Sequence, residues 1–199
     1  MARPRVHDDH LRQTLLEAAT DHVAEHGADF SLRPLVASVG TSTSAVYSLF
    51  GSRGGLVDAV TVRAASSLIE AQRAVEADSV TRRTESIART IRAWASAHPT
   101  MFQVVFGGAS GSAAVDEARE ATLAPLIEAI EAADDEGALA GGDPVVAARS
   151  VFAAVHGFVA LELLGVFAEE DADELFEAQL LALWRGWSAD AATASAEAG

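Results

Sequence analysis

Apolar residues recur at helical spacing along most of this chain, and no stretch alternates apolar and polar residues as a strand would. The first such pattern runs from about Asp9 to His26 and places Leu15 and Val23 on one helix face. The whole pattern predicts an all-α fold of nine helices, if the helix that contains Pro125 stays whole and is not divided there.

Glycine, proline and capping residues set the expected ends of these helices. Gly27 is expected to end the first helix, and Asp143-Pro144 to begin the last but one. The further helices are expected from Ser31 to about Gly40 and over about Thr43–Phe50, Leu56–Ala77, Thr81–Ala97, Thr100–Phe106, Ala113–Asp135, Pro144–Val166 and Asp171–Ser188.

The composition excludes several classes of protein. The chain has no cysteine, which rules out disulfides, thiolate catalysis and cysteine-bound zinc. No apolar run approaches the length of a membrane span, and the first residues lack the apolar core of a signal peptide. We therefore expect a cytoplasmic protein that needs no membrane, metal or cofactor.

The net charge of −15 argues against a broadly basic nucleic-acid-binding surface. The charge is unevenly divided, however. Residues 1–60 carry five Arg and seven acids, a net charge of −2, and residues 61–199 carry nine Arg and 22 acids, a net charge of −13. Any DNA-binding face must therefore be local and lie in the first part of the chain.

Two short helices separated by a glycine-containing turn are typical of a helix-turn-helix. Ser31 can cap the first helix, Gly40 breaks it, and Ser42 can cap the second. Four apolar residues can form the small core that fixes their crossing: Leu35, Val39, Val46 and Phe50.

The same segment resembles the DNA-binding signature of the TetR family, through Ala37, Gly40, Tyr47, Phe50 and Arg53. The resemblance implies that Arg33 contacts bases or phosphate, that Tyr47 and Arg53 hold phosphates, and that the second helix enters the major groove. The DNA-binding residues so implied are Arg33, Ser42, Thr43, Ser44, Ala45, Tyr47, Ser48, Leu49 and Arg53. The alternative is that these residues only cap and solvate a helix.

Two segments of the second part, residues 92–102 and 155–165, resemble the C-terminal domain of a TetR subgroup marked by a tryptophan before a His-Gly pair. Phe152 takes the place of that tryptophan before His156-Gly157. The residues that could line an apolar effector pocket are Trp94, His98, Met101, Phe102, Phe106, Phe152, His156 and Phe158. The alternatives are plain core, helix-to-helix hydrogen bonds of the two histidines, or a metal held by His98 and His156.

The last two helices carry apolar stripes that resemble the dimer-forming four-helix bundle of the family. The residues concerned are Val151, Val155, Phe158, Leu161, Phe176, Leu180, Leu183 and Trp187. The alternative is burial of these stripes within one subunit.

The sequence thus predicts a homodimeric repressor in which residues 1–55 bind a palindromic operator and residues 56–188 bind a small effector and dimerise. Residues 189–199 are expected to be a disordered tail. Arg3 and Arg5 could form a DNA-binding arm or an ordinary tail. His22 and His26 could bind a metal or could simply be surface histidines. Two other functions stay open: a dimeric ligand-binding protein whose helix-turn-helix no longer binds DNA, and a helical enzyme that uses His156 with Glu162, or His98.

Overall fold

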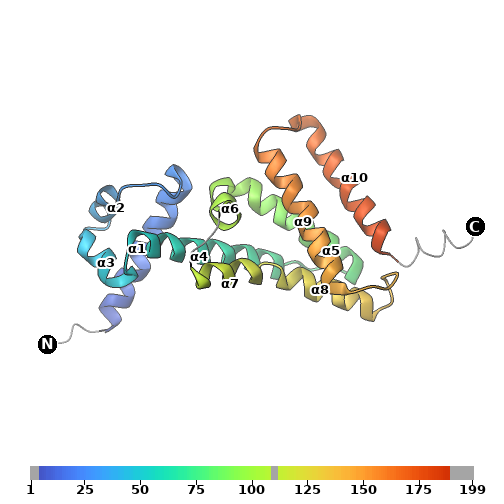
Figure 1. Ribbon diagram of the computed structural model, residues 1–199, viewed down its shortest axis with the longest axis horizontal. Helices are drawn as coiled ribbons and strands as arrows, with labels where there is room; N and C mark the ends of the chain where they lie inside the picture. Colours follow the sequence, from blue (N-terminus) through green and yellow to red (C-terminus); the bar gives the residue numbers. More distant parts are fainter. Residues whose placement is uncertain (1–4, 109–111, 189–199) are drawn as a thin grey trace, which may run out of the picture. The chain divides into compact units, whose positions relative to one another are not determined.

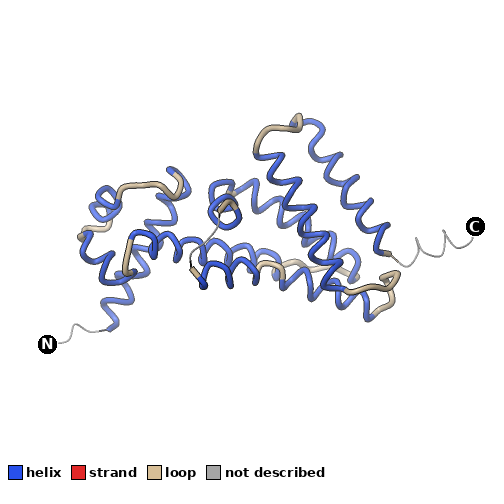
Figure 2. Tube along the Cα trace, in the orientation of Figure 1, coloured by secondary structure: helices blue, strands red, loops and turns tan. Residues whose placement is uncertain are grey.

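The computed structural model of the chain describes residues 5–108 and 112–188, and every regular element within them is a helix (Figures 1 and 2). The helices are α1 (Arg5–His26), α2 (Leu32–Ser38), α3 (Thr43–Phe50), α4 (Arg53–Arg73), α5 (Val80–Ala97), α6 (Pro99–Phe106), α7 (Ala113–Ala121), α8 (Ala124–Asp135), α9 (Pro144–Leu163) and α10 (Glu169–Trp187). The predicted all-α fold is confirmed. Arg3 and the tail 189–199 lie outside the described residues, as does the side chain of Arg5.

The segment expected as one helix over residues 113–135 is divided into α7 and α8, so the described residues form ten helices where nine were counted with that helix whole. Pro125 occupies the second position of α8, where its missing N–H costs no intrahelical hydrogen bond. The amides of Leu126 and Ile127 both donate to the carbonyl of Leu123, at 3.1 and 3.0 Å. Pro125 therefore starts a new helix and does not kink an existing one.

Helix α4 begins at Arg53, three residues before the predicted start, because the two glycines after Arg53 fit inside its first turn. The Ser52 hydroxyl accepts a hydrogen bond of 2.9 Å from the Gly55 amide and so caps the helix. A Cβ on Gly55 would lie 2.1 Å from the carbonyl oxygen of Phe50, so the close approach of α4 to the end of α3 requires glycine there.

The described chain forms two compact units. Unit 1 contains α1, α2, α3, α4 up to Ser67, α6, and α7 up to Glu120. In it α1 packs against α2, α3 and α6 (blue, cyan and green in Figure 1). Leu15, Val46 and Leu56 are fully buried at its core. The Thr100 hydroxyl donates to the carbonyl of Ala24 at 3.0 Å and fastens the start of α6 to the last turns of α1.

Unit 2 contains the rest of α4, α5, α8, α9 and α10. Helices α5, α8 and α9 pack against one another, and α10 lies beside α9 (Figure 1). Its buried residues include Ile87, Ile91, Leu126, Val155 and Phe176. Helix α9 is long and apolar enough to cross a membrane by length and composition. A third of this stretch is buried, and α5, α8 and α10 pack against α9, so its length and composition alone are weak evidence for a membrane span.

Candidate nucleic-acid interface

Helices α2 and α3 form the predicted helix-turn-helix. The Ser31 hydroxyl accepts from the Arg33 amide and caps α2, and Gly40 takes the left-handed backbone with φ of 69° in the turn. Leu35 and Val46 are buried between the helices. Val39 and Phe50, the other two members of the expected core, are less buried, and Phe50 is half-buried. The crossing of the two helices is therefore fixed mainly by Leu35 and Val46.

The outward face of α3 carries most of the residues expected to contact DNA. The Tyr47 ring is 55% exposed, the largest exposed aromatic side chain of unit 1. Ser42, Ser44 and Ser48 are also exposed, and the remaining members of the set lie on or beside the same helix. Arg33 is exposed on α2. The structure therefore brings together the members on and before α3, whereas Arg33 lies on α2 and Arg53 on α4.

A groove of about 470 Å³ runs beside this surface. It is lined by Asp8, Leu11, Thr41, Ser42, Ser44, Ala45, Ser48 and Leu49. Ser42 has the extended backbone of a helix cap, but its hydroxyl makes no capping hydrogen bond. The first amides of α3 therefore lack a side-chain acceptor such as the one that Ser31 gives to α2. Free amides at the N-terminus of a helix bind phosphate well.

Arg12 on α1 belongs to the same surface and was not expected there. Its guanidinium carbon lies 4.7 Å from the centroid of the Phe50 ring, at the end of α3, and the side chain is exposed. Among the described residues, no carboxylate lies within ion-pair distance of Arg12. The Phe50 ring thus holds a cation beside the end of α3. No local motif marks Arg12, since it is 38 positions from Phe50 in sequence.

Arg53 does not have the setting expected of a phosphate clamp. Its Nε donates to the Phe30 carbonyl at 2.8 Å, and one Nη donates to the Ala28 carbonyl at 2.6 Å and to Asp29 at 3.0 Å. The guanidinium also lies over the Phe30 ring, at 5.2 Å from its centroid. Arg53 therefore holds the loop between α1 and α2 against the start of α4.

The residues proposed for an effector pocket are divided between the two units. Trp94, Phe152 and His156 belong to unit 2, and the residues from His98 to Phe106 belong to unit 1. Trp94, Met101, Phe102 and Phe158 are buried, Phe106, Phe152 and His156 are half-buried, and His98 is exposed. Phe152 and His156 stack with ring centroids 6.3 Å apart. Burial lowers the pKa of His156, so this histidine stays neutral near pH 7.

Five of the eight residues expected at the dimer interface are buried within the chain itself. They are Val151, Val155, Phe158, Phe176 and Leu180, each exposed by 7% or less. Within the single chain these residues pack in unit 2, which leaves little of their surface accessible. Of the other three, Leu161 is 43% exposed, and Leu183 and Trp187 are half-buried.

Glu162, the partner of His156 in the enzyme hypothesis, is held in an ion pair. Arg92 donates to it through Nε at 3.0 Å, and Arg92 also pairs with Asp173 at 2.8 Å. The Arg92 guanidinium carbon lies over the rings of Phe158 and Phe176, at 5.5 and 4.8 Å from their centroids, and the two rings contact each other at 5.1 Å. These pairs raise the pKa of Arg92. Glu162 thus joins α9 to α5 and is not paired with a histidine.

The two histidines near the end of α1 stack on each other. The rings of His22 and His26 lie 4.4 Å apart, and His22 also contacts Phe30 edge-on at 5.1 Å. Within residues 5–108 and 112–188, no three side chains of His, Cys, Asp or Glu gather as a metal site would need. The geometry is that of an aromatic cluster beside the loop that Arg53 holds.

Residues 84–183 match the family described as tetracyclin repressor-like, C-terminal domain, which covers half of the chain. The chain belongs to the TetR family. It is accordingly a DNA-binding transcriptional regulator. Helices α2 and α3 form the helix-turn-helix of this TetR-family chain. No curated protein matches the chain.

Solved structures agree with this assignment. A protein of unknown function from Rhodococcus sp. RHA1 is 29% identical, with a TM-score of 0.80 over 89% of this chain and 95% of that one. A TetR family transcription regulator from Marinobacter aquaeolei VT8 is 19% identical, with a TM-score of 0.67 over 92% of this chain and 98% of that one. The regulator PfmR from Thermus thermophilus is 18% identical, with a TM-score of 0.61 over 86% and 97%. The last two show likeness of fold.

The family match covers the C-terminal part of this TetR-family chain and is independent of the helix-turn-helix residues. It includes Trp94, His98, Phe152 and His156. The match does not distinguish subgroups of the family, so the subgroup suggested by the His-Gly pair stays a prediction.

Proposed function

We propose that this TetR-family regulator is a homodimeric repressor that binds a two-fold symmetric operator through α3 of each subunit. The observation that carries the proposal is the helix-turn-helix of α2 and α3, which has Tyr47, Ser44 and Ser48 exposed on α3 and Arg33 exposed on α2. In a two-fold dimer the two α3 helices would enter successive major grooves, ~34–36 Å apart.

The side chains of this surface indicate how the operator is read. Tyr47 and Arg33 would contact phosphates or base edges, with Arg12 as an additional phosphate contact. Ser44, Ser48 and Leu49 are too short to make many bidentate base contacts, so specificity would depend on DNA shape and on thymine methyl groups. In this proposal Arg53 orders the loop behind the interface through its carbonyl hydrogen bonds.

The dimer would form through the exposed sides of α9 and α10. Large apolar side chains are exposed on these helices and just after α9: Leu161, Leu164, Val166, Leu175 and Leu181. Leu164 is 75% exposed, an unfavourable state for a leucine in a lone subunit. This supports a second copy of the chain as the cover of these residues.

A small apolar or amphipathic effector would release the repressor from DNA. The aromatic and histidine residues Trp94, Met101, Phe102, Phe152 and His156 support such a ligand by their chemistry. The effector would shift α4, which carries the helix-turn-helix at one end, and a coupling of ~1–3 kcal/mol would suffice for a useful switch. We accordingly propose functional divisions at residues 1–55 for DNA binding and 56–188 for effector binding and dimerisation.

The competing functions have less support. An enzyme that uses His156 and Glu162 would need a free carboxylate, whereas Glu162 is paired with Arg92. We propose that the chain is not an enzyme and acts in the cytoplasm, where its operator is. A ligand-binding protein that has lost DNA binding would have no reason to keep exposed Tyr47 and Arg33 on one surface.

Selection of DNA from a randomised pool tests the proposal. The full chain should enrich a palindrome whose half-sites lie one helical turn apart, or a multiple of one turn. The Tyr47→Ala variant should enrich no sequence. A pool that stays random with the unmodified chain would leave only the ligand-binding alternative.

A further inference from the structure

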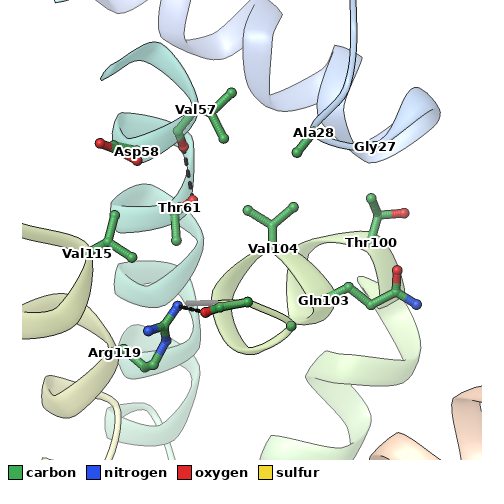
Figure 3. A pocket seen from close by; sticks show the side chains of 12 residues that line it. Gly27, Ala28, Val57, Asp58, Thr61, Thr100, Gln103, Val104, Val115 and Arg119 are labelled. Atoms are coloured by element: carbon green, nitrogen blue, oxygen red, sulfur yellow. Dashed lines mark hydrogen bonds between the residues drawn. The ribbon is translucent and has the colours of Figure 1, made fainter. Parts of the chain in front are cut away.

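Unit 1 contains a cavity of about 580 Å³ that shares no residue with the proposed effector region. Its walls come from the two residues after α1, the second and third turns of α4, α6 with the two glycines after it, and α7 (Figure 3). Its volume lies within the range of ~300–1,000 Å³ that small-molecule sites occupy. The cavity thus lies beside α4, which directly follows α3 in the chain.

The cavity has apolar walls with a carboxylate at one side. Figure 3 shows Val57 and Thr61 on α4 in the middle, Ala28 and Val104 on one side, and Asp58 on the other. Thr61 and Thr100 donate their hydroxyl protons to the carbonyls of Val57 and Ala24, so neither proton is left for a ligand. Of the residues that line the cavity, Asp58 alone carries a carboxylate.

The cations close to this cavity are already paired. Arg119, which lines it, donates to the carbonyls of Val105 and Gly108 and pairs with Asp116 at 3.2 Å. Arg53 donates to the Ala28 carbonyl and pairs with Asp29. In contrast, half-buried Asp58 has no hydrogen-bond or ion-pair partner among the described residues.

Two helix ends add to the negative potential at this place. Helix α1 ends at His26, just before Gly27 and Ala28, and α6 ends at Phe106, just before Gly107. The last carbonyls of a helix carry a partial negative charge of about half an electron, which favours a cation nearby. The unpaired carboxylate of Asp58 and the two helix ends therefore favour the same kind of ligand, a cation.

We propose that this cavity binds an amphipathic organic cation, with its ammonium group at Asp58 and its hydrocarbon part against Val57, Val104 and Val115. Such a ligand would contact α4, α6, α7 and the loop after α1, and would act on α3 through α4, which directly follows it in the chain. The regulatory consequence rests on the proposed function, but the binding itself does not.

Calorimetric titration of the full chain with n-octylammonium, below its micelle concentration, tests the site, with 1-octanol as the neutral probe of similar size. The unmodified chain should bind n-octylammonium more tightly than 1-octanol. Asp58→Asn keeps the shape of the side chain and should weaken n-octylammonium binding at least about tenfold, while 1-octanol binding stays the same. Asp21→Asn removes an equal charge from exposed α1, outside the cavity, and should change neither affinity.

Filling the cavity gives a second, independent variant. Val104→Trp should remove this binding site for both probes while the circular dichroism of the chain stays the same. The proposal would be overturned if the unmodified chain bound no n-octylammonium, or if Asp58→Asn bound it as tightly as the unmodified chain does. It would also be overturned if Asp21→Asn weakened this binding as much as Asp58→Asn. Operator binding is measured on the same preparations without probe, so failure of DNA binding and failure of this site remain distinguishable.

Discussion

The guanidinium carbon of Arg12 lies 4.7 Å from the centroid of the Phe50 ring, which joins a cation of α1 to the last residue of the DNA-reading helix. An aromatic ring holds an arginine in place and leaves its N–H groups available for phosphate oxygens. The surface around α3 thus has two exposed arginines, Arg12 and Arg33, although the chain as a whole is strongly acidic.

Replacing Arg12 with alanine should weaken operator binding about tenfold and reduce the salt slope of the dimer by about 2, since each phosphate contact contributes ~0.9. Fluorescence anisotropy over a range of salt concentrations measures both quantities. Arg83→Ala, an exposed arginine of α5, serves as the matched control and should change neither. A salt slope that is the same for Arg12→Ala and the unmodified chain would remove Arg12 from the interface.

Arg53 should matter for stability more than for phosphate binding. Arg53→Ala leaves the carbonyls of Ala28 and Phe30 without their donor and should lower the free energy of unfolding by about 1–3 kcal/mol. Arg53→Lys should recover little of it, because a single ammonium cannot match the fork of a guanidinium. Urea denaturation measures the change. Unchanged stability together with lost operator affinity would instead favour the phosphate clamp.

Arg92 and Glu162 form a largely buried pair, with side chains 16% and 19% exposed. Arg92→Met strands the carboxylate and should cost about 2–4 kcal/mol of unfolding free energy, and adding Glu162→Gln should return part of it. The control is Arg82→Met, whose pair with Asp78 is exposed and should be worth less than about 1 kcal/mol. An equal loss of unfolding free energy for Arg92→Met and Arg82→Met would contradict the description of the Arg92–Glu162 pair as buried.

His156 should make stability depend on pH. Burial lowers its pKa below the usual 6.5, so the unfolded chain takes up a proton at a higher pH than the folded chain does. The free energy of unfolding should therefore fall as the pH drops from about 7 to about 5, and His156→Gln should reduce that fall. Glu177 does not interfere, because Arg89 lowers its pKa from 4.5 and its contribution is lost only at lower pH. A steeper fall of the unfolding free energy in His156→Gln would contradict a lowered pKa of His156.

Exposed Leu181 of α10 should contribute to the dimer. Leu181→Glu should shift the mass in sedimentation equilibrium toward the monomer and weaken operator binding by more than about tenfold, since one half-site alone binds poorly. Tyr47→Ala is the crossed control: it should abolish operator binding and leave the mass of the dimer unchanged. A Leu181→Glu protein that remains fully dimeric would move the interface elsewhere.

The helix-turn-helix could be predicted because its signals are local. Ser31 caps α2 and Gly40 makes the turn within a few positions of the residues they serve. The dimer surface could not, because an apolar stripe looks the same whichever chain covers it. Val155 is fully buried by its own subunit, whereas Leu161, six positions later on the same helix, is 43% exposed.

The hydrogen bonds of Arg53 could not be predicted from the sequence pattern either. Its role depends on where the loop carbonyls of Ala28 and Phe30 point, and no residue type encodes that direction. Arg92 and Glu162 are 70 positions apart and meet only because α5 packs against α9. The early start of α4 has a local cause, the Ser52 cap, which the run of glycines concealed.

The most direct test of the central claim is the salt dependence of operator affinity for the unmodified chain and for the Arg33→Ala/Tyr47→Ala variant. The operator is the sequence enriched by the unmodified chain. The account predicts a large loss of affinity in the variant and a salt slope reduced by about 2, for one arginine in each subunit. Unchanged affinity with an unchanged salt slope would contradict the assignment of α3 and its surroundings as the DNA-binding surface.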